Sequence, residues 1–379
     1  MLLIKNATIC TMETEAPQQG DILIENGKIS KIGCDLLSGG AEVIDATGLI
    51  ATPGLIDAHL HTGGFISPSD LNEMTDPVTP QLDAIHAIDI YEPGFDQLRE
   101  NGVTAGCFIP GSTNIIGGTG FVAKTAGRSI REMAVLHPAV MKCALGINPK
   151  CYGKKGQAPM TRMGIASIFR ESLRKAKDYL EMKEAAGADK KKLPTYDAKC
   201  EALIPVLKKE IPLKVHCEQF DMITTIEIAK EFGCDYTIEH AWSCNLYADE
   251  LVEGGGSICF GPIGIPEGYG ELTGGDVACL KELDNRGLNV CLITDGPLSG
   301  PEILLISAGE AVRNGIAHHR ALRMVTINAA KALRVDDRLG SLKPGKDGDI
   351  VLWSAIPALE TSARVLYTII NGQIVYRGH

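Results

Sequence analysis

The sequence of 379 residues has no uninterrupted apolar run near the roughly 18 residues that a membrane-spanning helix needs. Its formal net charge is −10, which argues against a nucleic-acid or anionic-membrane partner, because both require a basic face. The 12 cysteines include no Cys-x-x-Cys pair and lie singly in apolar segments, so we expect reduced core residues rather than a disulfide framework. The apolar run at residues 1–9 is too short for a signal peptide and has no cleavage site. These features together predict a cytoplasmic protein.

Two nucleotide-binding signatures are also missing. No Gly-x-Gly-x-x-Gly follows the first strand expected in the central region, which disfavours a doubly wound dinucleotide-binding sheet. The Gly-rich stretch from Gly111 to Gly120 lacks the Lys-Ser/Thr ending of a P-loop and has no helix after it. We interpret it as a tight connection between two strands.

What the sequence does contain is the composition of a soluble globular protein, with 45% hydrophobic and 22% charged residues. Both ends show short β-strand patterns with an Asn-Gly hairpin turn, at Asn26-Gly27 and at Asn371-Gly372. Because chain termini commonly lie close together, we expect the two ends to complete one small sheet domain.

Between the ends, apolar strand patterns alternate with amphipathic helical patterns, which is typical of a parallel sheet. Eight candidate strands span residues 53–58, 103–109, 119–124, 139–145, 213–217, 236–240, 257–261 and 289–294. Eight such units predict an α/β fold of the (β/α)8 TIM-barrel type, with a doubly wound open sheet as the alternative. A long insertion at 149–211 carries two helical patterns. It is compatible with two roles, a lid over the site or a contact between subunits of an oligomer.

Metal-capable side chains follow the candidate strands. In Asp57-Ala58-His59-Leu60-His61 the two histidines point to the same face, because side chains in a strand alternate with period two. His216, His240 and Asp295 stand at the ends of later candidate strands, and barrel active sites lie at this end. Four of the nine histidines therefore occupy strand ends, which predicts a site for a divalent cation.

Several motifs resemble the metal-dependent amidohydrolase superfamily. Pro53-Gly54-Leu55-Ile56-Asp57-Ala58-His59-Leu60-His61 is similar to its opening motif, and the segment from Asp337 to Val351 is similar to its closing motif. Residues 110–118 and 144–150 resemble the imidazolonepropionase-related branch, which includes prolidase-like dipeptidases. The resemblance covers essentially the whole chain.

The resemblance implies a barrel at residues 53–338 and a composite β-sandwich domain from residues 1–52 and 339–379. It implies Zn²⁺ or a similar divalent ion, one or two per chain, with a ligand set of His59, His61, His216, His240 and Asp295. In two-metal relatives a carboxylated lysine after the fourth strand bridges the ions, and Lys142 fits that position, with Lys124 as a weaker alternative. The candidate substrate contacts on the loop face are Asn148, Lys150, Tyr152 and Tyr247.

Three positions depart from the family pattern. Ile147 stands where relatives often carry glutamate, so a bridging carboxylate at that place is missing and either Lys142 serves or the site holds one ion. Gly296 replaces a histidine that often follows the aspartate. Gln219 occupies the place of a glutamate found in deaminases, with Glu218 one residue earlier, which argues against deamination.

The ligand set predicts hydrolysis of an amide C–N bond by hydroxide generated at the metal, with Asp295 as the proton shuttle. The expected substrate is a small amide: a dipeptide, an N-acyl amino acid or a cyclic amide such as a hydantoin or imidazolone. A heterocycle deaminase is the alternative enzyme, and a barrel scaffold without catalysis is the alternative outside enzymes. We also expect a homo-oligomer.

Overall fold

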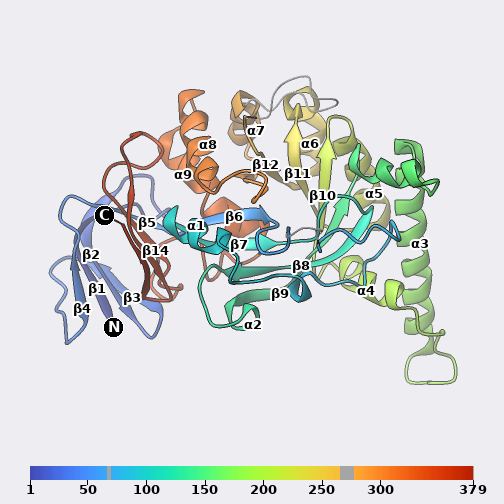
Figure 1. The fold of residues 1–379 in the computed structure, drawn as a ribbon, viewed down its shortest axis with the longest axis horizontal. Helices are drawn as coiled ribbons and strands as arrows, with labels where there is room; N and C mark the ends of the chain where they lie inside the picture. Colours follow the sequence, from blue (N-terminus) through green and yellow to red (C-terminus); the bar gives the residue numbers. More distant parts are fainter. Residues whose placement is uncertain (66–69, 265–276, 379) are drawn as a thin grey trace.

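The structure is a computed structural model that describes residues 1–65, 70–264 and 277–378. It has a mixed α/β fold in which a nearly closed barrel sheet lies beside a second sheet (Figure 1). The barrel sheet consists of β6 (Leu55–Leu60), β7 (Val103–Phe108), β8 (Ile116–Lys124), β9 (Ala134–Ala144), β10 (Leu213–Glu218), β11 (Tyr236–Trp242), β12 (Ser257–Phe260) and β13 (Val290–Leu292). All eight strands expected from the sequence are therefore present, with shifted ends.

One strand reverses the expected direction. β8 pairs antiparallel with β7 and with β9, whereas β6–β7 and the neighbours from β9 to β13 pair in parallel. The prediction of a parallel sheet throughout is wrong at β8. Residues 109–115 are too few for the crossover of about a dozen residues that parallel strands require. The interpretation of this Gly-rich stretch as a tight connection is confirmed.

The barrel closes through contacts between β6 and the segment after β13. Leu60 bridges Gly296, and the His61 N–H donates to the Gly296 carbonyl at 2.6 Å. Below this bridge, the Asp57 carboxylate accepts hydrogen bonds from the Thr294 backbone N–H and hydroxyl. These contacts fix the two strand ends that carry His59, His61 and Asp295.

Strands from both ends of the chain form the second sheet, where blue N-terminal and red C-terminal strands lie together in Figure 1. Its members are β1 (Leu2–Ile9), β2 (Gln18–Glu25), β3 (Lys28–Gly33), β4 (Glu42–Asp45), β5 (Ile50–Pro53), β14 (Ile350–Trp353), β15 (Val365–Ile370) and β16 (Gln373–Arg377). β5 joins the two halves by pairing in parallel with β1 and antiparallel with β14. Both expected hairpin turns have positive φ at their Asn-Gly residues, as a type I′ turn requires.

Helices flank the barrel strands. They are α1 (Gly94–Glu100), α2 (Ile130–Met133), α3 (Arg162–Ala186), α4 (Ala198–Leu207), α5 (Asp221–Phe232), α6 (Ala248–Gly254), α7 (Leu280–Asn285), α8 (Glu302–Arg313), α9 (His318–Met324) and α10 (Ile327–Ala332), with 3₁₀ turns η1 (Ala84–His86), η2 (Asn148–Lys155), η3 (Cys244–Tyr247) and η4 (Val277–Cys279). The predicted insertion folds as η2, α3 and α4, and α3 lies at the far end of the molecule from the terminal sheet (Figure 1). Within the described residues, no helix is long and apolar enough to cross a membrane.

Candidate metal centre

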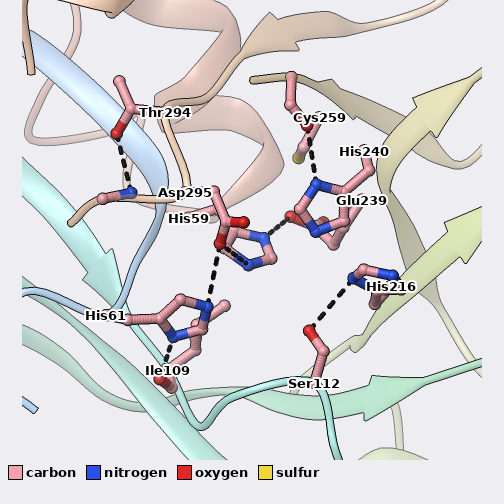
Figure 2. A network of polar contacts seen from close by, with 12 residues as sticks. His59, His61, Ile109, Ser112, His216, Glu239, His240, Cys259, Thr294 and Asp295 are labelled. Atoms are coloured by element: carbon pink, nitrogen blue, oxygen red, sulfur yellow. Dashed lines mark hydrogen bonds and ion pairs between the residues drawn. The ribbon is translucent and has the colours of Figure 1, made fainter. Parts of the chain in front are cut away.

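The carboxyl ends of the barrel strands bring the predicted histidines and aspartate to one region (Figure 2). Asp295 Oδ1 lies 3.4 Å from His59 Nε2 and 3.1 Å from His61 Nε2. One ligand atom from each of His59, His240 and Asp295 lies within 4.8 Å of the other two. The ring of His216 lies beside that of His240, with centroids 4.3 Å apart. The structure thus gathers residues that are up to 236 positions apart, from His59 to Asp295.

The Nδ1 atoms of three of these histidines are held by oxygen acceptors of the surrounding protein. The pairs are His59 with Glu239 Oε2 at 2.8 Å, His61 with the Ile109 carbonyl at 2.9 Å and His240 with the Gly261 carbonyl at 2.7 Å. An N–H at Nδ1 donates to each oxygen, which leaves the lone pair of Nε2 facing the shared region. This is the tautomer in which imidazole binds a cation through Nε2.

In His216 the roles of the two ring nitrogens are exchanged, because Nε2 rather than Nδ1 meets the oxygen acceptor. Its Nε2 lies 3.0 Å from Glu218 Oε1 and 3.4 Å from Asn148 Nδ2. Its Nδ1 lies 3.1 Å from the Ser112 hydroxyl. Because the carboxylate of Glu218 accepts from Nε2–H, the lone pair of His216 is on Nδ1, on the side of Ser112.

Lys142 lies within the same group of residues. Its Nζ is 3.2 Å from His59 Nε2 and 3.2 Å from the Ser112 hydroxyl. Lys124, the weaker candidate, does not reach this region: its Nζ pairs with Asp347 at 2.8 Å and with Asp349 at 3.0 Å. Since β8 runs antiparallel, its last residue lies at the opposite end of the barrel from the histidines. Of the two candidate lysines, Lys142 is therefore the one placed to contact the site.

Burial shifts the ionisation of this group of residues. Desolvation lowers the pKa of His216 and of His240 to about 3 and lowers the pKa of His59 well below 6.5. These rings are therefore neutral at pH 7, the form that binds metals. Burial opposes the charge of Asp295, but the neighbouring His61, His240 and Lys142 favour that charge, and the pKa of Asp295 is lowered to about 2. Desolvation lowers the pKa of Lys142 to about 8.

His240 reaches the site through an unusual backbone. Glu239 points into the barrel toward His59, so regular alternation along β11 would turn His240 outward. The structure instead has positive φ at His240 (66°) and at Ala241 (52°), a conformation that non-glycine residues seldom adopt. This turn in the backbone places adjacent side chains on the same side of the barrel.

Among the residues proposed to contact substrate, Asn148 lies at the site through its contact with His216. Tyr152 does not, since its buried hydroxyl donates to the backbone carbonyls of Glu73 at 2.8 Å and Asp76 at 3.1 Å. Lys150 lies in η2, and Tyr247 packs partly buried against the hydrophobic core. The hydroxyl of Tyr152 thus anchors a loop rather than facing the metal-capable residues.

A sequence model of the Amidohydrolase family matches residues 50–375. This chain belongs to the amidohydrolase family. It is therefore an enzyme of the metal-dependent amidohydrolase superfamily, a hydrolase that acts on carbon–nitrogen bonds. The assignment confirms the resemblance seen in the opening and closing motifs.

Four comparisons place this amidohydrolase among known proteins. The crystal structure of an amidohydrolase from Thermotoga maritima is 36% identical, with each chain fully covered and a TM-score of 0.95. Amidohydrolase tasK of Hapsidospora irregularis is 28% identical over 89% of this chain, which spans only 38% of that protein's length. A 5-methylthioadenosine/S-adenosylhomocysteine deaminase of Clostridium tetani is 23% identical over 99% of this chain and 93% of its own. A prolidase solved with N-methylphosphonate-L-proline shares the fold over the full length of both chains, at 17% identity and a TM-score of 0.60.

The residues present in this amidohydrolase fit a metal ion. His240 Nε2 is fully buried and has no hydrogen-bond partner among the residues that the structure describes. A buried nitrogen lone pair without a partner costs free energy, and His240 offers a ligand atom within 4.8 Å of those of His59 and Asp295. Neutral imidazoles with a carboxylate are the donor set that Zn²⁺ and similar ions prefer.

Sequence reasoning missed the charged residues beneath the ligands. The fully buried Lys214 Nζ and His59 Nδ1 each lie 2.8 Å from Glu239 Oε2. Lys214 and Glu239 interrupt apolar strands, and two opposite charges in buried strands are expected to pair, so the sequence does contain a signal for them. Ser112 offered no such signal, because its approach to His216 depends on the path of a loop.

Proposed function

We propose that this amidohydrolase hydrolyses the C–N bond of a small amide with Zn²⁺ or a similar divalent ion. The ion would be held by His59, His61, His216, His240 and Asp295. The observation that carries the proposal is the buried His240 Nε2, which has no hydrogen-bond partner in the described part of the chain, on a residue that offers a ligand atom within 4.8 Å of those of His59 and Asp295. When bound, such an ion polarises a carbonyl and lowers the pKa of water from 15.7 to about 7.

The chain's own residues then provide orientation and proton transfer. The Asp295 side chain is 13% exposed, whereas His59 and His61 beside it are 0% and 2% exposed, so among these three the carboxylate is the most accessible to substrate. Asp295 accepts a proton from the attacking water and passes it to the leaving nitrogen, and its Oδ1 lies 3.1 Å from His61 Nε2. His216 and His240 are neutral, and the one N–H that each keeps is directed at Glu218 or at the Gly261 carbonyl, so neither ring competes in this proton transfer.

Asp295→Asn tests the shuttle. We expect the variant to keep its metal and to lose turnover by about 10²- to 10⁴-fold, the usual contribution of a positioned acid–base group. Metal content by mass spectrometry and amide hydrolysis are measured on the same sample, with Asp284→Asn as a control, because Asp284 pairs with Arg320 outside the site. Full turnover with retained metal would remove Asp295 from the shuttle role.

The substrate class is part of the proposal: a dipeptide, an N-acyl amino acid or a cyclic amide such as a hydantoin or imidazolone. The prolidase with the same fold supports a dipeptide as the substrate. The deaminase relative favours deamination of a heterocycle as the second candidate function. Gln219 argues against the second, because the family resemblance implies glutamate at that place in deaminases. A panel of these amides and of aminoheterocycles with the Zn²⁺-loaded enzyme separates the two, since only deamination releases ammonia.

The remaining expectations from the sequence stay proposals. We propose a composite β-sandwich domain from residues 1–52 and 339–379 on a barrel of residues 53–338, which the shared terminal sheet supports. A carboxylated Lys142, a homo-oligomer and a cytoplasmic location are proposed on the same footing. Light scattering of the purified protein tests the oligomer.

A further inference from the structure

Two pairs of cysteine sulfurs lie close together in the described part of the chain. The Sγ atoms of Cys244 and Cys279 are 3.1 Å apart, and those of Cys259 and Cys291 are 3.3 Å apart. A disulfide bond measures about 2.05 Å, so each pair needs to approach by roughly 1 Å to form one. The two pairs differ in access, because Cys259 and Cys291 are both 0% exposed whereas Cys279 is partly exposed.

The accessible pair lies on the face of the barrel that carries the metal-capable residues. Cys244 is the first residue of η3, two positions after the end of β11, and Cys279 is the last residue of η4, directly before α7. Cys244 is fully buried, and its contact with Cys279 together with burial raises the pKa of its thiol. Of the two residues, Cys279 is therefore the one that a reagent from solvent can reach, whereas Cys244 is buried.

We propose that Cys244 and Cys279 form a redox-modification site that closes to a disulfide on reaction with a small disulfide such as oxidised glutathione. The Cys279 thiolate attacks the reagent, which breaks the S–S bond and releases one thiol, leaving a mixed disulfide on Cys279. The Cys244 thiol then loses its proton, and its sulfur attacks Cys279 Sγ and releases the second thiol. Two protons leave the protein, which is oxidised by two electrons while the reagent is reduced to two thiols.

The site is coupled to His240 through a short, constrained segment. Three of the four residues from 240 to 243 have positive φ: His240 (66°), Ala241 (52°) and Ser243 (66°). The fourth, Trp242, has its ring 5.0 Å from that of His240, and its Nε1–H donates to the Pro262 carbonyl at 3.4 Å. Non-glycine residues keep such conformations only where their surroundings fix them.

A movement of Cys244 therefore displaces His240 as well, because the constrained backbone between them cannot take up the movement. This coupling rests on the proposed metal function, whereas formation of the disulfide does not.

The chemical part is tested on the reduced, full-length protein incubated with oxidised glutathione. Differential alkylation and peptide mapping then locate the oxidised thiols. We expect a Cys244–Cys279 disulfide, with Cys259 and Cys291 still reduced because no reagent reaches them. Cys279→Ser should prevent the reaction, and Cys291→Ser is the matched control that should leave it intact. Free thiols at both Cys244 and Cys279, or equal oxidation of the fully buried pair, would overturn the proposal.

The coupling is tested by chelator competition for Zn²⁺ on reduced and oxidised protein. We expect oxidation to weaken Zn²⁺ binding by about tenfold, the lower end of the effect of residues that orient metal ligands. Dithiothreitol should reverse the change, and Cys279→Ser should not show it. Unchanged affinity in protein that carries the disulfide would refute the coupling. Protein that binds no Zn²⁺ in either state would refute the proposed function, and peptide mapping would still decide the fate of the thiol pair.

Discussion

The buried pair of Glu239 and Lys214 beneath His59 provides the sharpest test of how this site is held. Glu239 Oε2 lies 2.8 Å from both His59 Nδ1 and Lys214 Nζ, and Glu239 Oε1 accepts from the Thr237 hydroxyl at 2.6 Å. In Glu239→Gln the amide oxygen can take the place of Oε2, while the Thr237 hydroxyl can turn to accept from the amide nitrogen. The substitution thus preserves the geometry and removes the charge.

Two effects of different size follow from this change. His59 becomes a weaker ligand, because a carboxylate on the other ring nitrogen raises the basicity of a metal-binding histidine, and we expect a loss of about 10- to 100-fold in metal affinity. Lys214 loses its counter-charge inside the protein, which costs about 3 to 5 kcal/mol of folding free energy. The double variant Glu239→Gln/Lys214→Met should recover most of that stability but not the metal affinity.

Chelator competition and urea unfolding of the same samples measure both effects. Lys124→Met is the matched control, because it breaks a buried ion pair with Asp347 and Asp349 outside the site. It should lower stability and leave metal affinity unchanged. Wild-type affinity in Glu239→Gln would refute the reasoning, since Glu239 would then serve only the fold.

Two further predictions concern protons and metal count. The free energy of unfolding of the metal-free protein should fall as the pH drops below 6.5, because unfolded histidines bind protons there that His216 and His240, with pKa values of about 3, do not bind. Each contributes about 2 kcal/mol between pH 6.5 and 5, so urea unfolding that gives the same stability at both pH values would contradict these shifts. Lys142→Met should bind one ion fewer per chain than the wild type, measured by metal analysis with bicarbonate in the buffer. An equal metal count would show that Lys142 bridges no ions.

The barrel strands and the positions of the candidate ligands could be predicted from the sequence for a physical reason. Several of the apolar strands end in a polar residue that is rarely buried in a dry core without a function, as His59 and His216 show. The period-two rule also accounts for His59 and His61 sharing a face. These signals are local and need no knowledge of the neighbouring strands.

Other features depend on tertiary structure. The period-two rule fails at His240, where positive φ places His240 and Glu239 on one side of the barrel. Ser112 reaches His216 only because residues 109–115 form a short connection into an antiparallel strand. The sequence pattern did not predict β5, because its four residues adopt a strand only by pairing with strands from both ends of the chain.

The pairing of β5 with β14 also sets an order of events during synthesis. Pro53 lies opposite Ile350 and Ile50 lies opposite Trp353, so about 300 residues separate the partners. At roughly 5 to 20 residues per second, the ribosome needs about 15 to 60 s to deliver β14 after β5 has emerged. During that time β1 to β5 expose an unpaired strand edge, which is a template for aggregation. The nascent chain therefore needs protection at its first fifty residues until its last strands arrive.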